Sequence, residues 1–182
     1  MYDFKTLKTK IAETEEWLKK ELMTIQTGRA TPAILDGVLV DSYGTKVHVN
    51  QVANITTEDA RTLRIVPWDK DSIRAIETAI RDADMGLGVS VDDQGVQVGF
   101  PELTTETREK FVKLVRDKVE DAKIALRNVR DEVWSDIQRK EKAGDIGEDD
   151  KFRFKDKMEK IVKEGNETLG GLAERKEKEI LG

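Results

Sequence analysis

Five basic side chains recur at helical spacing in the C-terminal half of the chain. They are Lys113, Arg116, Lys123, Arg127 and Arg130. At about 100° of rotation per residue they form one stripe along a helix, and Trp134 continues it. Arginine can pair with a phosphate through two hydrogen bonds, and arginine or tryptophan planes can stack on unpaired bases. The pattern therefore indicates a surface that could follow an RNA backbone.

The same stripe also fits a solvated helix face held by ion pairs. Glu109 and Glu120 lie on it or next to it and favour that alternative. Arg29 adds a further basic group at the end of the first predicted helix, where it could pair with the negative end of the helix dipole or reach the same flank of a bundle. Periodicity does not decide between these interpretations.

Signatures of catalysis and metal binding are missing from the sequence. There is no cysteine, and the single histidine, His48, lies in a polar and apolar alternation that predicts an exposed strand residue. Glu148, Asp149 and Asp150 lack the spacing of a calcium loop, so a solvated helix start is favoured over a magnesium-dependent nuclease site. No phosphate-binding glycine loop or nucleophile elbow occurs. We expect a protein that is not an enzyme and needs no cofactor or metal.

Two proline-free flanks must position the stripe, because all three prolines fall between residues 32 and 101. A helix is expected from about Phe4 to Gln26, ended by Gly28 and Pro32. A second, over about 105–143, has apolar residues in alternating steps of three and four, which is typical of a coiled-coil seam. A third follows over about 149–180, and Gly165, Gly170 and Gly171 should make its C-terminal half the weakest part of a three-helix bundle.

The segment between the flanks has the period of two that is typical of strands. A hairpin is expected at 38–40 and 46–49, a third strand at 62–66, a helix at 71–82 and a second ribbon at 89–91 and 96–100. The fold class is therefore α+β, with a small β/α/β domain, 31–104, inserted into a helical domain formed by 1–30 and 105–182. Two connections join them, so we expect a hinge at Ala30, Thr31, Leu103, Thr104 and Thr105.

The net charge of -5 is unevenly distributed along the chain. Residues 31–104 carry 12 acidic and 6 basic side chains, whereas 105–182 carry 20 of each. The excess negative charge therefore lies in the predicted insert, away from the stripe. No export signal and no run of about 20 apolar residues occurs, so we expect a cytoplasmic protein.

Short motifs over essentially the whole chain are similar to those of the ribosome recycling factor family. They are Thr27-Gly28-Arg29-Ala30, Leu35-Asp36-Gly37, Tyr43-Gly44-Thr45, Arg61-Thr62-Leu63, Trp68-Asp69-Lys70, Pro101-Glu102-Leu103-Thr104 and Arg127-Asn128-Val129-Arg130. The resemblance implies an L-shaped molecule with dimensions like those of transfer RNA. It also implies a monomeric factor that binds large-subunit ribosomal RNA and acts with elongation factor G and GTP to separate the ribosomal subunits.

Carried over by resemblance, Arg29, Arg127 and Arg130 are expected to contact RNA, and Gly28 to permit a close backbone approach. The chain departs from the family pattern at Asp131 and at Thr107, where arginines are usual. Asp131 should weaken the attraction of phosphate to Arg130 or fix that arginine by pairing. The alternative function is a helical scaffold or chaperone-like bundle, which an exposed apolar seam would favour.

Overall fold

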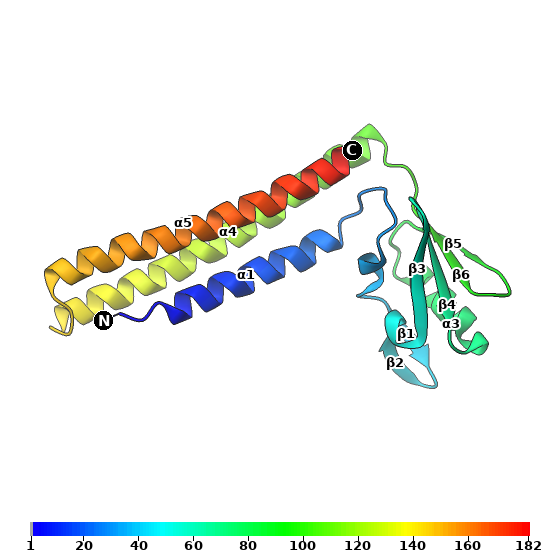
Figure 1. The fold of residues 1–182 in the computed structure, drawn as a ribbon, viewed down its shortest axis with the longest axis horizontal. Coiled ribbons are helices and arrows are strands. Elements are labelled where there is room, and N and C mark those ends of the chain that lie inside the picture. The colour runs from blue at the N-terminus through cyan, green and yellow to red at the C-terminus, as the bar shows by residue number, and fades with distance from the viewer. Residues whose placement is uncertain (1) are drawn as a thin grey trace. The chain divides into compact units, whose positions relative to one another are not determined.

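The computed structural model describes residues 2–182, which divide into two compact units (Figure 1). The first joins the segment up to Leu22 with Lys110–Gly182, and the second is Met23–Glu109. Long helices make up the first and a small β unit the second, so the α+β class is confirmed. No helix within residues 2–182 combines the length and apolar character needed to cross a membrane.

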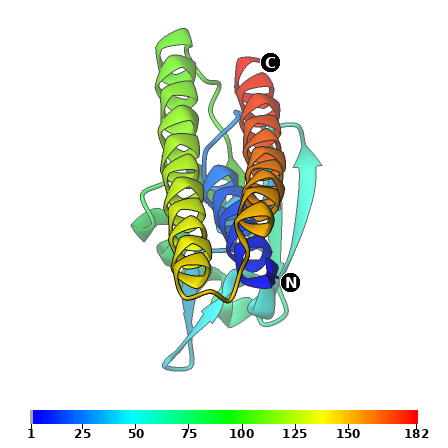
Figure 2. The same cartoon turned by 90° about the vertical axis from the view of Figure 1, so that its left-hand side faces the viewer.

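The first unit is a bundle of α1 (Lys5–Met23), α4 (Thr105–Lys142) and α5 (Glu148–Leu181), which lie side by side in Figures 1 and 2. Ion pairs join Lys10 to Glu132 and Glu21 to Lys118, both at 2.7 Å, so α1 runs antiparallel to α4. The predicted seam of α4 is buried along its whole length. Its residues are Val112, Val115, Val119, Ala122, Leu126, Val129, Val133 and Ile137. The seam is thus the core of the bundle, and it is not available as a scaffold surface.

An aromatic cluster closes one end of the bundle. Phe4 lies 5.0 Å from Tyr2 and 6.3 Å from Phe154, measured between ring centroids. The Tyr2 hydroxyl donates a hydrogen bond of 2.8 Å to Asp136 of α4. Burial and this carboxylate raise the pKa of Tyr2 to about 12, and the same hydrogen bond lowers the pKa of Asp136. The segment before α1 is therefore tied to both long helices.

Replacing Tyr2 by Phe should lower the free energy of unfolding by about 1 kcal/mol at pH 7, because the bond to Asp136 is lost. A tyrosine whose folded pKa is raised stabilises the fold below its unfolded pKa of about 10 and loses that contribution as the pH rises through about 12. The difference between the two proteins should therefore shrink over that range. Urea unfolding followed by helical circular dichroism at pH 7 and pH 11 would measure it.

Tyr43→Phe is the matched control. Its exposed hydroxyl also donates to a carboxylate, that of Asp69 at 2.6 Å, but outside the bundle. An equal loss of helical stability in both variants would contradict a specific role for Tyr2.

Helix α5 runs without interruption from Glu148 to Leu181, and Gly165 lies buried inside the bundle. A Cβ atom on Gly165 would come within 2.9 Å of Ile11 Cγ2 and 3.1 Å of Leu126 Cδ2, whereas one on Gly170 or Gly171 would meet nothing within 4 Å. The expected weakness of the C-terminal half of α5 stays a prediction, but Gly165 also has a packing role, because its missing side chain lets α5 pack closely on α1 and α4.

The second unit holds a hairpin, β1 (Leu39–Ser42) with β2 (Thr45–His48), and a four-stranded sheet in the order β3-β4-β6-β5. The sheet strands are β3 (Ala53–Asp59), β4 (Thr62–Pro67), β5 (Gly88–Val91) and β6 (Val96–Gly99), and all neighbours are antiparallel. Helix α3 (Ile73–Asp82) buries Ile76 and Ile80 in the same core as Leu63 and Val98. The predicted hairpin, ribbon and helix are confirmed.

Two elements of this unit differ from the expectation. Residues 49–52 form a helical turn, α2 (Val49–Val52), so Val49 is not part of the strand; the side chain of Gln51 accepts a hydrogen bond from the His48 amide and helps to start the turn. Strand β3 was not predicted, because after Ile55 it carries only polar or charged residues, and these are exposed. Short 3₁₀ turns at Pro32–Leu35 and Lys70–Ser72 complete the unit.

Candidate RNA-binding surface

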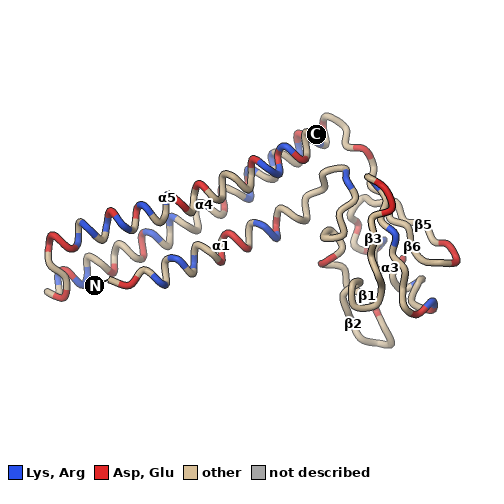
Figure 3. Tube along the Cα trace, in the orientation of Figure 1, with Lys and Arg blue, Asp and Glu red and all other residues tan. Residues whose placement is uncertain are grey.

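The five basic residues Lys113, Arg116, Lys123, Arg127 and Arg130, called here the cation stripe, lie on α4. The flank they occupy is the one next to α5, since Arg116 pairs with Glu177 and the ring of Trp134 lies 5.3 Å from Lys155 Nζ. Lys118 and Glu132, by contrast, pair with α1. The buried seam therefore separates two flanks of α4, and the cation stripe occupies one of them. Figure 3 shows charged residues of both signs along all three helices.

Arg116 is held by a carboxylate of the neighbouring helix. Its Nε and Nη2 atoms donate to Oε1 and Oε2 of Glu177 at 3.0 and 3.3 Å, a two-point pairing that raises the pKa of Arg116. The Arg116 side chain is still 68% exposed. An exposed pair of this kind contributes little to stability, so a phosphate could replace Glu177 as the partner.

Arg130 is held by its neighbour in sequence, Asp131. The Nε and Nη2 atoms both donate to Asp131 Oδ1, at 3.0 and 2.7 Å, and the pairing raises the pKa of Arg130. The carboxylate pairs with Arg130 and not with Arg127. Asp131 was expected either to weaken the attraction of phosphate to Arg130 or to fix that arginine by pairing. The structure shows the pairing, which holds the Arg130 guanidinium in place.

The other three members of the stripe have no such partner. Within residues 2–182, Lys113, Lys123 and Arg127 form no ion pair, and neither Glu109 nor Glu120 pairs with any member of the stripe. Lys113 and Arg127 are exposed and Lys123 is half-buried. A helix face held by ion pairs therefore describes Arg116 and Arg130, and the RNA-binding interpretation of the stripe stays a prediction.

Gly28 and Arg29 belong to the second unit, and the stripe to the first. Gly28 has a φ of +78°, which favours glycine, and a Cβ atom there would lie 3.3 Å from Leu103 Cγ. The positive φ and the close approach of Leu103 therefore give a structural reason for a glycine at position 28. Arg29 is exposed and has no ion pair in the described part of the chain.

The residues expected to form the hinge make defined backbone contacts. The Ala30 amide donates to the Ala60 carbonyl at 2.9 Å, and the Thr104 side chain accepts from the Thr107 amide at 3.2 Å, where α4 begins. Thr105 is the first residue of α4, while Thr31 and Leu103 lie outside helices and strands. The hinge itself stays a prediction.

The histidine and the acidic cluster that were weighed as metal or catalytic groups lie at the ends of secondary-structure elements. His48 is exposed at the end of β2, as predicted. Glu148, Asp149 and Asp150 form the first turn of α5, where Asp150 pairs with Arg153 at 2.7 Å. Among residues 2–182 no group of three or more histidine, cysteine or carboxylate side chains is arranged to hold a metal ion.

The family model described as ribosome recycling factor matches residues 18–181. A ribosome-recycling factor of Fervidobacterium nodosum is 41% identical over 177 residues, which cover 97% of this chain and 96% of the relative. One from Chlorobium limicola is 41% identical over 175 residues, covering 96% and 94%. The solution structure of a ribosome recycling factor aligns with a TM-score of 0.81 and 31% identity over 100% of this chain and 99% of that one.

A helical bundle with an inserted β unit, matched in this way along its length, defines a translation factor of a non-enzymatic family. The chain belongs to the ribosome recycling factor family. The resemblance inferred from the short motifs is thereby confirmed.

Proposed function

We propose that this protein recycles ribosomes: it binds the post-termination ribosome and, with elongation factor G and GTP, promotes dissociation into subunits and release of mRNA and tRNA. The observation that carries the proposal is the match to the family over nearly the whole chain. A second similar structure, with a TM-score of 0.68 and 36% identity over 98% of this chain and 97% of that one, describes models for the T. thermophilus ribosome recycling factor and the E. coli elongation factor G bound to the E. coli post-termination complex. GTP would be bound and hydrolysed by elongation factor G.

The cation stripe is the surface proposed to contact large-subunit ribosomal RNA, with Gly28 and Arg29 as further contacts. Lys113, Lys123 and Arg127 can bind phosphate without breaking an internal ion pair. Arg116 and Arg130 would exchange a carboxylate for a phosphate. Residues 1–30 and 105–182 are thus assigned the RNA contact.

The inserted part, 31–104, is proposed as the part on which elongation factor G acts. Its 12 acidic and 6 basic side chains suit a part that moves past RNA and does not bind it tightly. Motion would be absorbed at Ala30, Thr31, Leu103, Thr104 and Thr105. The protein is proposed to act as a monomer in the cytoplasm, where ribosomes translate.

Co-sedimentation with empty 70S ribosomes, followed by light scattering after addition of elongation factor G and GTP, tests the proposal. We expect binding, and a fall in scattering that depends on this protein. Binding without subunit separation, using elongation factor G from several bacteria, would restrict the function to ribosome binding. Absence of binding would remove the proposed function.

Arg130→Glu should weaken ribosome binding several-fold while helical circular dichroism stays unchanged. The change replaces a cation that can reach phosphate by an anion next to Asp131. The ratio of the two affinities should narrow as salt rises from 50 to 200 mM, because fewer counterions are released by the variant. A fixed ratio over that range would contradict a phosphate contact. Glu132→Gln on the other flank of α4 is the control for substitution in this helix.

A further inference from the structure

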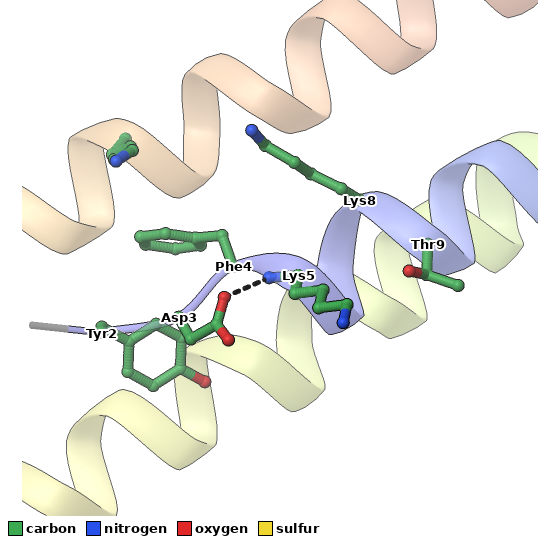
Figure 4. Close-up of a pocket in the computed structure, with 7 residues that line it drawn as sticks. Tyr2, Asp3, Phe4, Lys5, Lys8 and Thr9 are labelled. Carbon is green, nitrogen blue, oxygen red and sulfur yellow. Dashed lines mark hydrogen bonds between the residues drawn. The ribbon is translucent and has the colours of Figure 1, made fainter.

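A groove runs along the bundle between α1 and α5, on the flank of α5 away from the cation stripe. It consists of two open hollows of about 480 and 510 Å³ that share Lys8 and Lys157, so that they are continuous. We call it the α1/α5 groove. Figure 4 shows its first part, where Lys8 extends from α1 toward α5 and the Phe4 ring lies between the two helices.

Lysines outnumber carboxylates along this groove. Its walls carry Lys5, Lys8, Lys157 and Lys160 against Asp3, Glu15 and Glu164. The first hollow has three of these lysines and Asp3 alone, and Asp3 accepts a hydrogen bond of 2.8 Å from the Lys5 amide. The floor is apolar: Lys157 Nζ lies 5.5 Å from the centre of the Phe4 ring, and Ile11 and Gly165 line the second hollow. The groove is therefore positively charged at its first end.

The lysines of the groove also lack the ion pairs that other cations of the bundle form. Lys10, Lys19, Lys118, Lys151 and Arg153 each lie within 3.2 Å of a carboxylate oxygen. In contrast, Lys5, Lys8, Lys157 and Lys160 have no ion pair within residues 2–182. In the first hollow three unpaired lysines repel one another more than Asp3 can offset, and a bound polyanion would remove that repulsion.

We propose that the α1/α5 groove binds a second segment of RNA phosphate backbone, so that the bundle contacts RNA on both flanks of α5. This inference rests on the proposed function, since the RNA is that of the ribosome. Lysines are flexible point charges that neutralise phosphates without reading bases, and the first hollow places Lys5, Lys8 and Lys157 around an apolar floor with Asp3 as its one carboxylate. The contact is therefore independent of base sequence, and it adds to the salt dependence of binding.

The test is the double variant Lys8→Gln with Lys157→Gln, compared with Lys20→Gln with Lys178→Gln. Both pairs remove two positive charges from α1 and α5, but Lys20 and Lys178 lie outside both hollows. Ribosome binding is measured by co-sedimentation at several salt concentrations. The groove pair should lower the slope of log affinity against log salt by about two, on the order of one unit for each lysine removed. It should also weaken ribosome binding about tenfold at low salt. The control pair should change neither.

Equal effects of the two pairs, or no effect of the groove pair, would overturn the proposal. Thermal unfolding of both variants separates loss of binding from loss of folding. The proposed function fails on a different result, namely absence of ribosome binding by the unchanged protein, so the two failures are distinguishable.

The class of partner is tested separately. Because the chain has no cysteine, Ala12→Cys places a single thiol in the second hollow for a photo-activated cross-linker. Cross-links to ribosomal RNA that disappear with the Lys8 and Lys157 changes are expected. Cross-links to ribosomal protein alone would assign the groove to an acidic protein and overturn the RNA assignment.

Discussion

Replacing Lys113, Lys123 and Arg127 together by glutamine should lower ribosome affinity on the order of a hundredfold near 0.1 M salt and reduce the salt slope by about three. These three members of the cation stripe form no ion pair within residues 2–182, so nothing inside the protein competes for their charge. Each contact with phosphate releases a counterion, and the three losses add. Co-sedimentation across a salt series measures both quantities.

The triple change Lys20→Gln, Lys163→Gln and Lys178→Gln is the matched control, with the same net charge and all three sites outside the stripe. If it weakened binding as strongly as the stripe variant, only the overall charge would matter and the stripe would lose its assignment. Arg116→Gln offers an internal comparison. Its smaller expected effect reflects the Glu177 carboxylate, which already offsets its charge.

Gly165→Leu should destabilise the bundle by about 1–3 kcal/mol, because the new side chain would enter space that Ile11 and Leu126 already occupy. Gly170→Ala in the same helix should instead stabilise it by up to about 1 kcal/mol, since alanine favours the helix and a Cβ atom meets nothing there. Urea unfolding followed by helical circular dichroism compares them. An unchanged unfolding midpoint in Gly165→Leu would contradict the close packing at this glycine.

The long helices could be predicted from the sequence because their apolar residues repeat without interruption. The steps of three and four from Val112 to Ile137 correspond residue by residue to the buried seam of α4. The first helix is less sharply marked: it ends at Met23, before the expected Gln26, whose side chain instead donates to the Met85 carbonyl. That contact lies 59 residues away in sequence and has no local signal.

Strand β3 could not be predicted in the same way. Its position is determined by backbone pairing with β4, from Ala53 opposite Pro67 to Asp59 opposite Thr62, and not by an apolar alternation of its own. It lies at the edge of the sheet, and most of its side chains are exposed.

The candidate surface shows the same division between local and distant contacts. Helical spacing was sufficient to place the cation stripe on one flank of α4. The pairing of Arg130 with Asp131 could be expected because the two residues are adjacent in sequence. Glu177, which holds Arg116, lies 61 residues further along the chain, so its role depends on how α4 and α5 pack. The packing role of Gly165 could not be predicted for the same reason, because its contacts come from two other helices.

Helix α1 is separated in sequence from the two helices on which it packs, and this affects how the protein folds during synthesis. Helix α1 leaves the synthesising ribosome first, yet its buried residues Leu7, Ile11 and Leu18 pack against helices that begin at Thr105. Roughly 80 residues must be added in between, which takes on the order of ten seconds at typical bacterial translation rates. During that interval the strands of Ala53–Gly99 can pair among themselves, whereas the apolar face of α1 has no helix to pack against. Nascent α1 therefore exposes its apolar face until α4 and α5 have been synthesised, and during that time it needs protection from aggregation.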